Sequence, residues 1–269
     1  MTKLDALCSS LAQMAPLALA ESWDNVGLLV GRRSAEVDQV MTCLTITPEV
    51  VQEAIGRSVG LIVTHHPLPF QPLKKITSDS STGQMLLSLI GAGVAVYSAH
   101  TAFDSAEQGI NQSWVNRLGL QHSRPLVAAD EDAANPLGSG RYGELPAAMP
   151  LSDLVHRAAR WVPADSIRFV GDPAATTKRV ASACGSGGSF LADADRLGCD
   201  AMITGEATFH TCLDAKARGL ALILIGHYHS ERFAMERLAD SLAAQHADLA
   251  VWASRAETDP IRSFPSLVP

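Results

Sequence analysis

The sequence predicts an α/β protein built from two similar α/β halves with mixed or parallel sheets. Short apolar runs such as 61–64 and 222–225 alternate with segments whose apolar residues recur at helical spacing. The order strand, helix, strand, helix occurs twice along the chain. Such alternation is typical of parallel or mixed sheets with helices packed against them.

The composition indicates what kind of protein this is. The chain has 269 residues, of which 47% are hydrophobic and 18% charged, so we expect a soluble globular protein of one or two domains. The net charge of −7 and the lack of long basic runs argue against nucleic-acid binding. Five scattered cysteines without CxxC spacing predict neither a zinc ribbon nor a disulfide framework, and they favour the reducing cytoplasm.

The first element is predicted to be an amphipathic helix, because apolar residues recur at helical spacing through residues 4–15. Asp5 and Gln13 interrupt the segment, which argues against a signal peptide. The longest uncharged stretch, 86–103, contains Gly91, Gly93 and His100 and is a poor candidate for a membrane span. We therefore expect no membrane partner.

A faint internal duplication links the two halves. After Cys43 a helical pattern leads to a strand ending at Thr64, and after Cys184 a similar pattern leads to a strand ending at Thr204. The next strand of each half runs into His100 or His227. Residues able to bind metals therefore occupy equivalent places in the two halves.

The duplication suggests a division along the chain. We predict a first half at 1–123, a linker rich in Ala, Asp, Glu and Pro at 124–136, and a second half at 137–246. Residues 247–269 would hold a last strand, 249–252, and a tail. The pattern does not tell which half that strand joins.

The histidine pair His65-His66 is the most informative motif. Pro67 favours an extended conformation at His66, and neighbouring side chains on an extended segment diverge. Two diverging imidazoles could each serve one of two metal ions a few ångströms apart. The alternative interpretation is two unrelated polar residues in a turn.

Two further strand ends carry possible ligands. His100 and Asp104 follow the run 94–97, and His227, His229 and Glu231 follow the run 222–225. In open α/β sheets, ligands collect beyond such strand ends. If Gly226 opens a helix, His227 and Glu231 share one face and could share a metal, although a solvated helix pair would have the same spacing.

Taken together, these motifs resemble the Nif-three-like dinuclear metal-centre family, also described as GTP cyclohydrolase type-two homologues. The resemblance covers nearly the whole chain and rests on the segments 21–28, 64–67, 100–104, 204–206 and 226–231. It implies that His65, His66, Asp104, His227 and Glu231 are the metal ligands, with one carboxylate bridging two ions. It also implies toroidal homohexamers and C-terminal strands exchanged between the halves. The chain departs from the family pattern at Thr45 and Gly60, where Asp is common.

Three imidazoles and two carboxylates without thiolate suit two divalent ions of zinc, iron or manganese. His100, Glu206 and His229, and also His210, would then lie near the metals as proton shuttles, as substrate contacts or as groups that orient the imidazoles. The alternative for all of them is ordinary hydrogen bonding at strand ends.

Two glycine-containing segments have open interpretations. The loop 185–189 could cradle a phosphate, but it lacks a P-loop lysine, so a tight turn forced by backbone crowding is favoured. The segment 23–27 could line a substrate pocket or form a structural turn.

The sequence therefore favours a metal-dependent hydrolase of a small nucleotide-like or otherwise polar metabolite. A GTP cyclohydrolase-type activity is implied only by the name of the family. The alternative is a non-catalytic, metal-binding ring protein that acts in metal storage, chaperoning or partner interaction.

Overall fold

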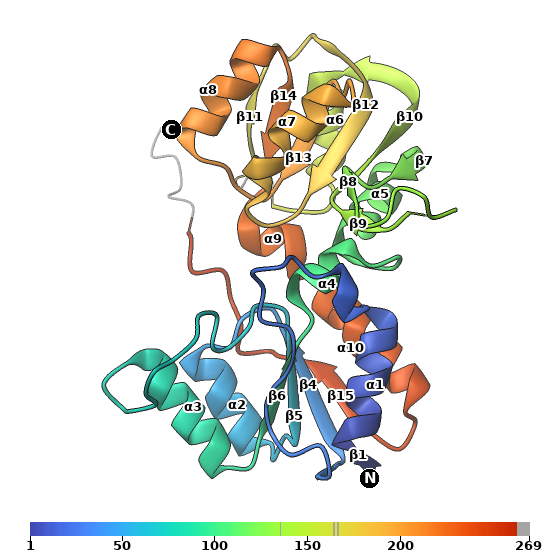
Figure 1. The fold of residues 1–269 in the computed structure, drawn as a ribbon. Helices are drawn as coiled ribbons and strands as arrows, with labels where there is room; N and C mark the ends of the chain where they lie inside the picture. Colours follow the sequence, from blue (N-terminus) through green and yellow to red (C-terminus); the bar gives the residue numbers. More distant parts are fainter. Residues whose placement is uncertain (135, 164, 166, 263–269) are drawn as a thin grey trace. The chain divides into compact units, whose positions relative to one another are not determined.

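The computed structural model describes residues 1–134, 136–163, 165 and 167–262. They form two compact units (Figure 1). The first unit comprises residues 1–108 and 232–257, and the second comprises the described residues of 109–231 and 258–262. Both units combine a mixed sheet with helices, which confirms the predicted α/β class.

The first unit has a five-stranded sheet in the order β15-β4-β5-β6-β2. Its strands are β2 (Gly27–Val30), β4 (Gln39–Cys43), β5 (Leu61–Thr64), β6 (Ala95–Ser98) and β15 (Ala250–Ala253). Strands β15, β4, β5 and β6 run parallel, and β2 is antiparallel to β6. A separate two-stranded ribbon pairs β1 (Thr2–Lys3) with β3 (Glu36–Val37).

Helices cover both faces of this sheet, with α2 and α3 on one side and α1 and α10 on the other (Figure 1). The helical elements are α1 (Leu4–Met14), η1 (Leu17–Leu19), α2 (Pro48–Gly56), α3 (Ser81–Gly91), α4 (His100–Ser105) and α10 (Ala234–Gln245). The predicted amphipathic first helix is confirmed, since α1 buries Leu4, Leu7 and Leu11. Helix α2 begins where the Thr47 hydroxyl accepts the Val50 amide and Pro48 occupies the first turn.

The second unit has a six-stranded sheet in the order β11-β14-β13-β12-β10-β7. Its strands are β7 (Gln121–Arg124), β10 (Arg141–Pro150), β11 (Arg168–Val170), β12 (Thr176–Ala183), β13 (Ala201–Thr204) and β14 (Ala221–Leu224). The helical elements are α5 (Ile110–Leu118), α6 (Leu151–Ala158), η3 (Gly187–Phe190), α7 (Leu191–Arg196), α8 (Phe209–Arg218) and α9 (His227–Glu231). A small ribbon pairs β8 (Val127–Ala128) with β9 (Gly138–Ser139).

The two sheets share an order of strands. Each contains a run of three neighbouring parallel strands that follow one another along the chain, β4-β5-β6 or β12-β13-β14. An antiparallel strand lies beside the last strand of each run. In both sheets the middle strand ends on a threonine, Thr64 or Thr204. This agreement fits the predicted internal duplication, which stays a prediction.

Packing divides the chain differently from the predicted halves. The predicted boundaries follow the order of the chain, whereas packing assigns 109–123 to the second unit and 232–257 to the first. The last strand, β15, pairs with β4 of the first unit, a partner that the sequence pattern left open. An exchange of C-terminal strands stays a prediction.

A partly buried carboxylate on helix α2, that of Glu53, binds the segment after β15. Glu53 accepts hydrogen bonds from the Ser254 hydroxyl at 2.6 Å and from the backbone amides of Arg255 and Ala256 at 3.0 and 3.1 Å. Burial alone would raise the pKa of Glu53, but these hydrogen bonds outweigh it and the pKa is lowered. The ionised carboxylate is therefore the form that stabilises this contact.

Replacing Glu53 with glutamine is expected to reduce the free energy of unfolding by about 1 kcal/mol at pH 7, because a charged acceptor is lost. A lowered pKa in the folded state gives stability that is present above the unfolded pKa and is lost as the pH falls through the folded value. Urea unfolding curves of the wild type and E53Q should therefore converge in acid. The exposed Glu36→Gln variant is the control, and an E53Q deficit that persists in acid would contradict this role of the charge.

Within the part of the chain that the structure describes, no helix is long and apolar enough to cross a membrane.

Candidate metal centre

The histidine pair lies just beyond the end of β5, where the chain bends. Strand β5 ends at Thr64, and the Thr64 hydroxyl lies 3.2 Å from the Leu44 carbonyl and 2.9 Å from the His66 carbonyl. Both histidines fall in a bend of the chain. The extended conformation expected at His66 stays a prediction. The centroids of the two rings are 5.1 Å apart. Whether each imidazole serves a different metal ion stays a prediction.

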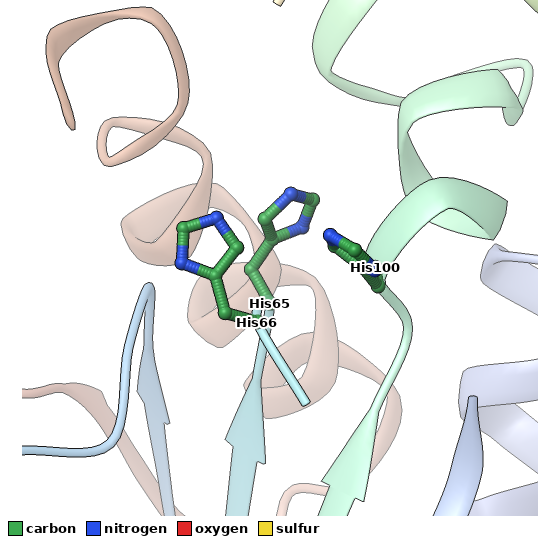
Figure 2. Close-up of side chains that lie close together, drawn as sticks. All are labelled: His65, His66 and His100. Atoms are coloured by element: carbon green, nitrogen blue, oxygen red, sulfur yellow. The ribbon is translucent and has the colours of Figure 1, made fainter. Parts of the chain in front are cut away.

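His100 brings a third imidazole to the pair. Its ring centroid lies 5.2 Å from that of His65 and 5.6 Å from that of His66. Figure 2 shows His65 and His66 at the end of β5 and His100 at the start of α4. One ring nitrogen from each histidine lies within 4.8 Å of the others, which is close enough for the three to hold one metal ion. The sequence predicted that His100 lies near the metals without binding them, whereas in the structure it is one of the three histidines close enough to hold an ion.

Asp24 fixes the orientation of His100. Its carboxylate lies 2.7 Å from His100 Nδ1 and also accepts the amide and hydroxyl of Thr101 at 3.1 and 2.5 Å. Burial alone would raise the pKa of Asp24, but the hydrogen bonds from His100 and Thr101 outweigh it and lower the pKa to about 2. Because an ionised carboxylate only accepts, Nδ1 of His100 carries a proton and Nε2 is the nitrogen able to bind a metal. His100 has a backbone φ of 26°, which is rare for a non-glycine residue.

A second chain of contacts orients His66. The Thr45 hydroxyl lies 2.7 Å from His66 Nδ1, and the Thr45 amide donates to Glu257 at 2.6 Å. Glu257 also accepts the Leu44 amide and pairs with Arg232. A neutral hydroxyl therefore lies behind the imidazole of His66. With Nδ1 bonded to Thr45, a metal would bind His66 through Nε2.

Asp104, another predicted ligand, lies on the same face of the first unit. Its carboxylate is 3.6 Å from His65 Nε2, and it stands one turn into α4 after His100. His65 is almost fully buried, with 2% of its surface exposed. The first unit thus brings three imidazoles and one carboxylate together from the ends of two neighbouring parallel strands.

The second unit holds its own predicted ligands on α9. Gly226 has a φ of 87°, and the helix begins at His227, as predicted. His227 Nε2 lies 3.2 Å from Glu231 and His227 Nδ1 lies 3.0 Å from Glu206. The hydrogen bond to Glu231 is the largest of the effects that raise the pKa of His227 to about 9, and the charge of Glu231 and the bond to Glu206 add to it. The pair is therefore not a solvated helix pair, because Glu231 is only 2% exposed.

Close side-chain contacts explain two glycines of the segment that follows β12. A Cβ at Gly185, whose φ is 60°, would collide with Glu231 Oε1, and one at Gly187 would lie 2.6 Å from Ala183 Cβ. The amides of Gly185 and Gly187 already donate to the hydroxyls of Ser230 and Thr204. These facts support the tight turn over the phosphate cradle, since both amides are occupied.

The remaining predicted residues also belong to the second unit. His229 is two residues from both His227 and Glu231, so it projects from the other side of α9, where it lies 3.3 Å from Asp259. His210 is exposed on α8 beside Phe209. Glu206 contacts His227 through Nδ1. The catalytic roles of His229 and Glu206 stay predictions.

Sequence reasoning missed Asp24 and Thr45 as residues that orient imidazoles. Asp24 acts on a residue 76 positions away, and Thr45 on one 21 positions away. The only available signals were the resemblance motif around Asp24 and the departure from the family pattern at Thr45.

Fold and site together define a class: a mixed α/β protein with a histidine-rich candidate metal centre at the ends of its parallel strands. The Duf34/NIF3 (NGG1p interacting factor 3) family model matches residues 2–260. The chain belongs to the Duf34/NIF3 family.

Similar proteins agree with this assignment. A Clostridium acetobutylicum protein named GTP cyclohydrolase 1 type 2 homolog is 38% identical over 229 residues, which cover 85% of each chain. The Drosophila melanogaster NIF3-like protein 1 is 31% identical over 96% of this chain and 88% of its own. Among solved structures, the Staphylococcus aureus protein SA1388 superposes with a TM-score of 0.86 at 29% identity, covering 97% of this chain and 99% of that one.

Proposed function

We propose that this protein is a metal-dependent hydrolase of a small nucleotide-like or otherwise polar metabolite. The observation that carries the proposal is the group formed by His65, His66 and His100, whose ring nitrogens lie within 4.8 Å of one another. Buried imidazoles that are oriented by hydrogen bonds to their second nitrogen are typical of metal sites.

The proposed ligands come from both units: His65, His66 and Asp104 from the first, and His227 and Glu231 from the second. We propose that they bind two divalent ions of zinc, iron or manganese, with one carboxylate bridging them. The donor chemistry supports this, since each unit carries imidazole and carboxylate donors and the set contains no thiolate. The family resemblance supports the combination of ligands from the two units.

A divalent ion held by such donors supplies an activated water for hydrolysis at neutral pH. The chain's own residues would orient the substrate and move protons. His100, which is outside the proposed ligand set, is suited to moving protons, because Asp24 holds a proton on Nδ1 and Nε2 can accept one. Glu206, hydrogen-bonded to His227 Nδ1, would hold that imidazole in one orientation.

Turnover that depends on a bound metal tests the proposal. Protein stripped with a chelator and reloaded separately with zinc, iron or manganese is assayed on phosphoesters, amides and nucleotides. GTP is included because several relatives are named for it. We expect at least one compound to be hydrolysed by a reloaded form and by no stripped form. Metal binding without any turnover would reject the hydrolase and leave a metal-binding protein.

We also propose that the chain assembles as a homohexamer and acts in the cytoplasm. The family resemblance supports the first point. The five cysteines support the second, because all lie within the described residues and none forms a disulfide. A monomer mass in light scattering would contradict the hexamer.

A further inference from the structure

Two large aromatic side chains lie exposed beside the histidine group of the first unit. Trp23 is 61% exposed and Phe70 is 50% exposed. Their rings touch each other in a tilted arrangement, with centroids 6.0 Å apart, and both present an edge contact to His100 at 5.9 and 6.0 Å. Side chains of this size gain free energy from burial, so adjacent exposed rings indicate a surface that binds something.

Hydrogen bonds hold these two rings in place although they face solvent. Asn25 Nδ2 donates to the Pro69 carbonyl at 2.9 Å, which ties the segment carrying Trp23 to the segment carrying Phe70. Asp24, between Trp23 and Asn25, is anchored by His100 and Thr101. A ligand that stacks on these rings would therefore lose little free energy to ordering the protein.

We propose that Trp23 and Phe70 form a stacking subsite for a planar aromatic or heteroaromatic ring of a small molecule. That ring would stack on the exposed part of either side chain, because ring centroids 6.0 Å apart leave too little room for a further ring between them. Because both aromatic rings contact His100, we expect the same ligand to carry a polar group that can reach the imidazoles. The subsite's role in substrate binding rests on the proposed hydrolase function, and it narrows the substrate class to ring-bearing polar metabolites.

Calorimetric titration with matched probes tests the subsite without relying on turnover. The probes are GMP, pterin-6-carboxylate and nicotinate, with ribose 5-phosphate as the counterpart of GMP that lacks the aromatic base. Base stacking on an aromatic side chain corresponds to about 5- to 100-fold in affinity. We expect GMP or another ring-bearing probe to bind more tightly than ribose 5-phosphate by a factor in this range. Equal affinity for all probes, or no binding by any, would overturn the proposal.

Variants locate the binding on the aromatic pair. Trp23→Leu and Phe70→Leu should each lower the affinity for the ring-bearing probe about 5- to 100-fold. The affinity for ribose 5-phosphate should not change. Trp23→Phe keeps a flat ring and should restore most of the affinity, which separates stacking from a folding defect. Phe209→Leu, at an exposed aromatic of the second unit, and Leu73→Ala, at an exposed aliphatic residue after Phe70, are the controls.

A stacking subsite and an interface between copies of the chain respond differently to these variants. If Leu73→Ala weakens the probe as much as Phe70→Leu and also lowers the particle mass, the aromatic pair belongs to such an interface and the subsite is rejected. If the wild type binds the ring-bearing probe but hydrolyses no substrate, and Trp23→Leu loses that binding, the subsite is supported and the hydrolase is rejected. If the protein hydrolyses a substrate and both leucine variants bind the probe as tightly as the wild type, the subsite is rejected and the hydrolase is supported.

Discussion

Replacing His66 with alanine is expected to abolish metal-dependent turnover, and replacing Glu231 with alanine should do the same. The two residues come from different units, but the proposal makes both of them ligands. Removing a residue that only orients a ligand typically costs 10- to 100-fold in metal affinity or activity, so loss of a ligand itself should exceed about 100-fold. The measurement is kcat on the substrate found with the metal-loaded wild type.

The exposed His156→Ala variant is the control for loss of an imidazole far from the candidate ligands in the sequence. It should retain wild-type turnover after the same metal loading. Unchanged kcat in H66A would remove the first unit's histidines from the proposed mechanism. Unchanged kcat in E231A would confine the chemistry to the first unit.

Replacing Gly185 with alanine is expected to disturb the second unit's ligands without removing any of them. The new Cβ would collide with Glu231 Oε1 and lie 3.4 Å from His227 Nε2. Gly185 also has a left-handed φ of 60°, which costs an L-residue roughly 1–2 kcal/mol. Because Glu231 is buried, its carboxylate must move to relieve the collision. We expect lower metal content and at least about 10-fold lower turnover.

Gly219→Ala provides a matched control for the backbone strain. Gly219 has a similar φ of 72°, but a Cβ there would meet no atom within 4 Å. Both variants should unfold at lower urea concentration, whereas only G185A should lose metal. A G219A protein with the same metal loss would show that strain, rather than the collision with Glu231, is responsible.

Local patterns predicted the elements that carry the candidate ligands. The apolar run before His65 forms β5, and Gly226 with the spacing of His227 and Glu231 predicted a helical face that the structure confirms. These features depend on neighbours within a few residues, which a single sequence displays. The resemblance to the family added the role of Asp104, for which local pattern gave only a position after a strand.

Long-range contacts account for what the sequence did not predict. The bend at His65 depends on a Thr64 hydroxyl within reach of the carbonyls of Leu44 and His66, and the orientation of His100 depends on Asp24. Neither contact has a periodic signal. The parallel pairing of β4 with β5 brings Thr64 close to Leu44, and the antiparallel pairing of β2 with β6 brings Asp24 close to His100. The aromatic pair is similar, since the contact of Trp23 with Phe70 follows from how two loops meet.

The most direct test of the central claim is the metal content of the purified protein and of its H66A and E231A variants, measured by elemental analysis after identical loading. If donors of both units hold the metals together, the wild type should carry about two ions per chain, and each variant should lose metal. A full complement of metal in E231A, with loss only in H66A, would contradict a centre shared by the two sets of ligands.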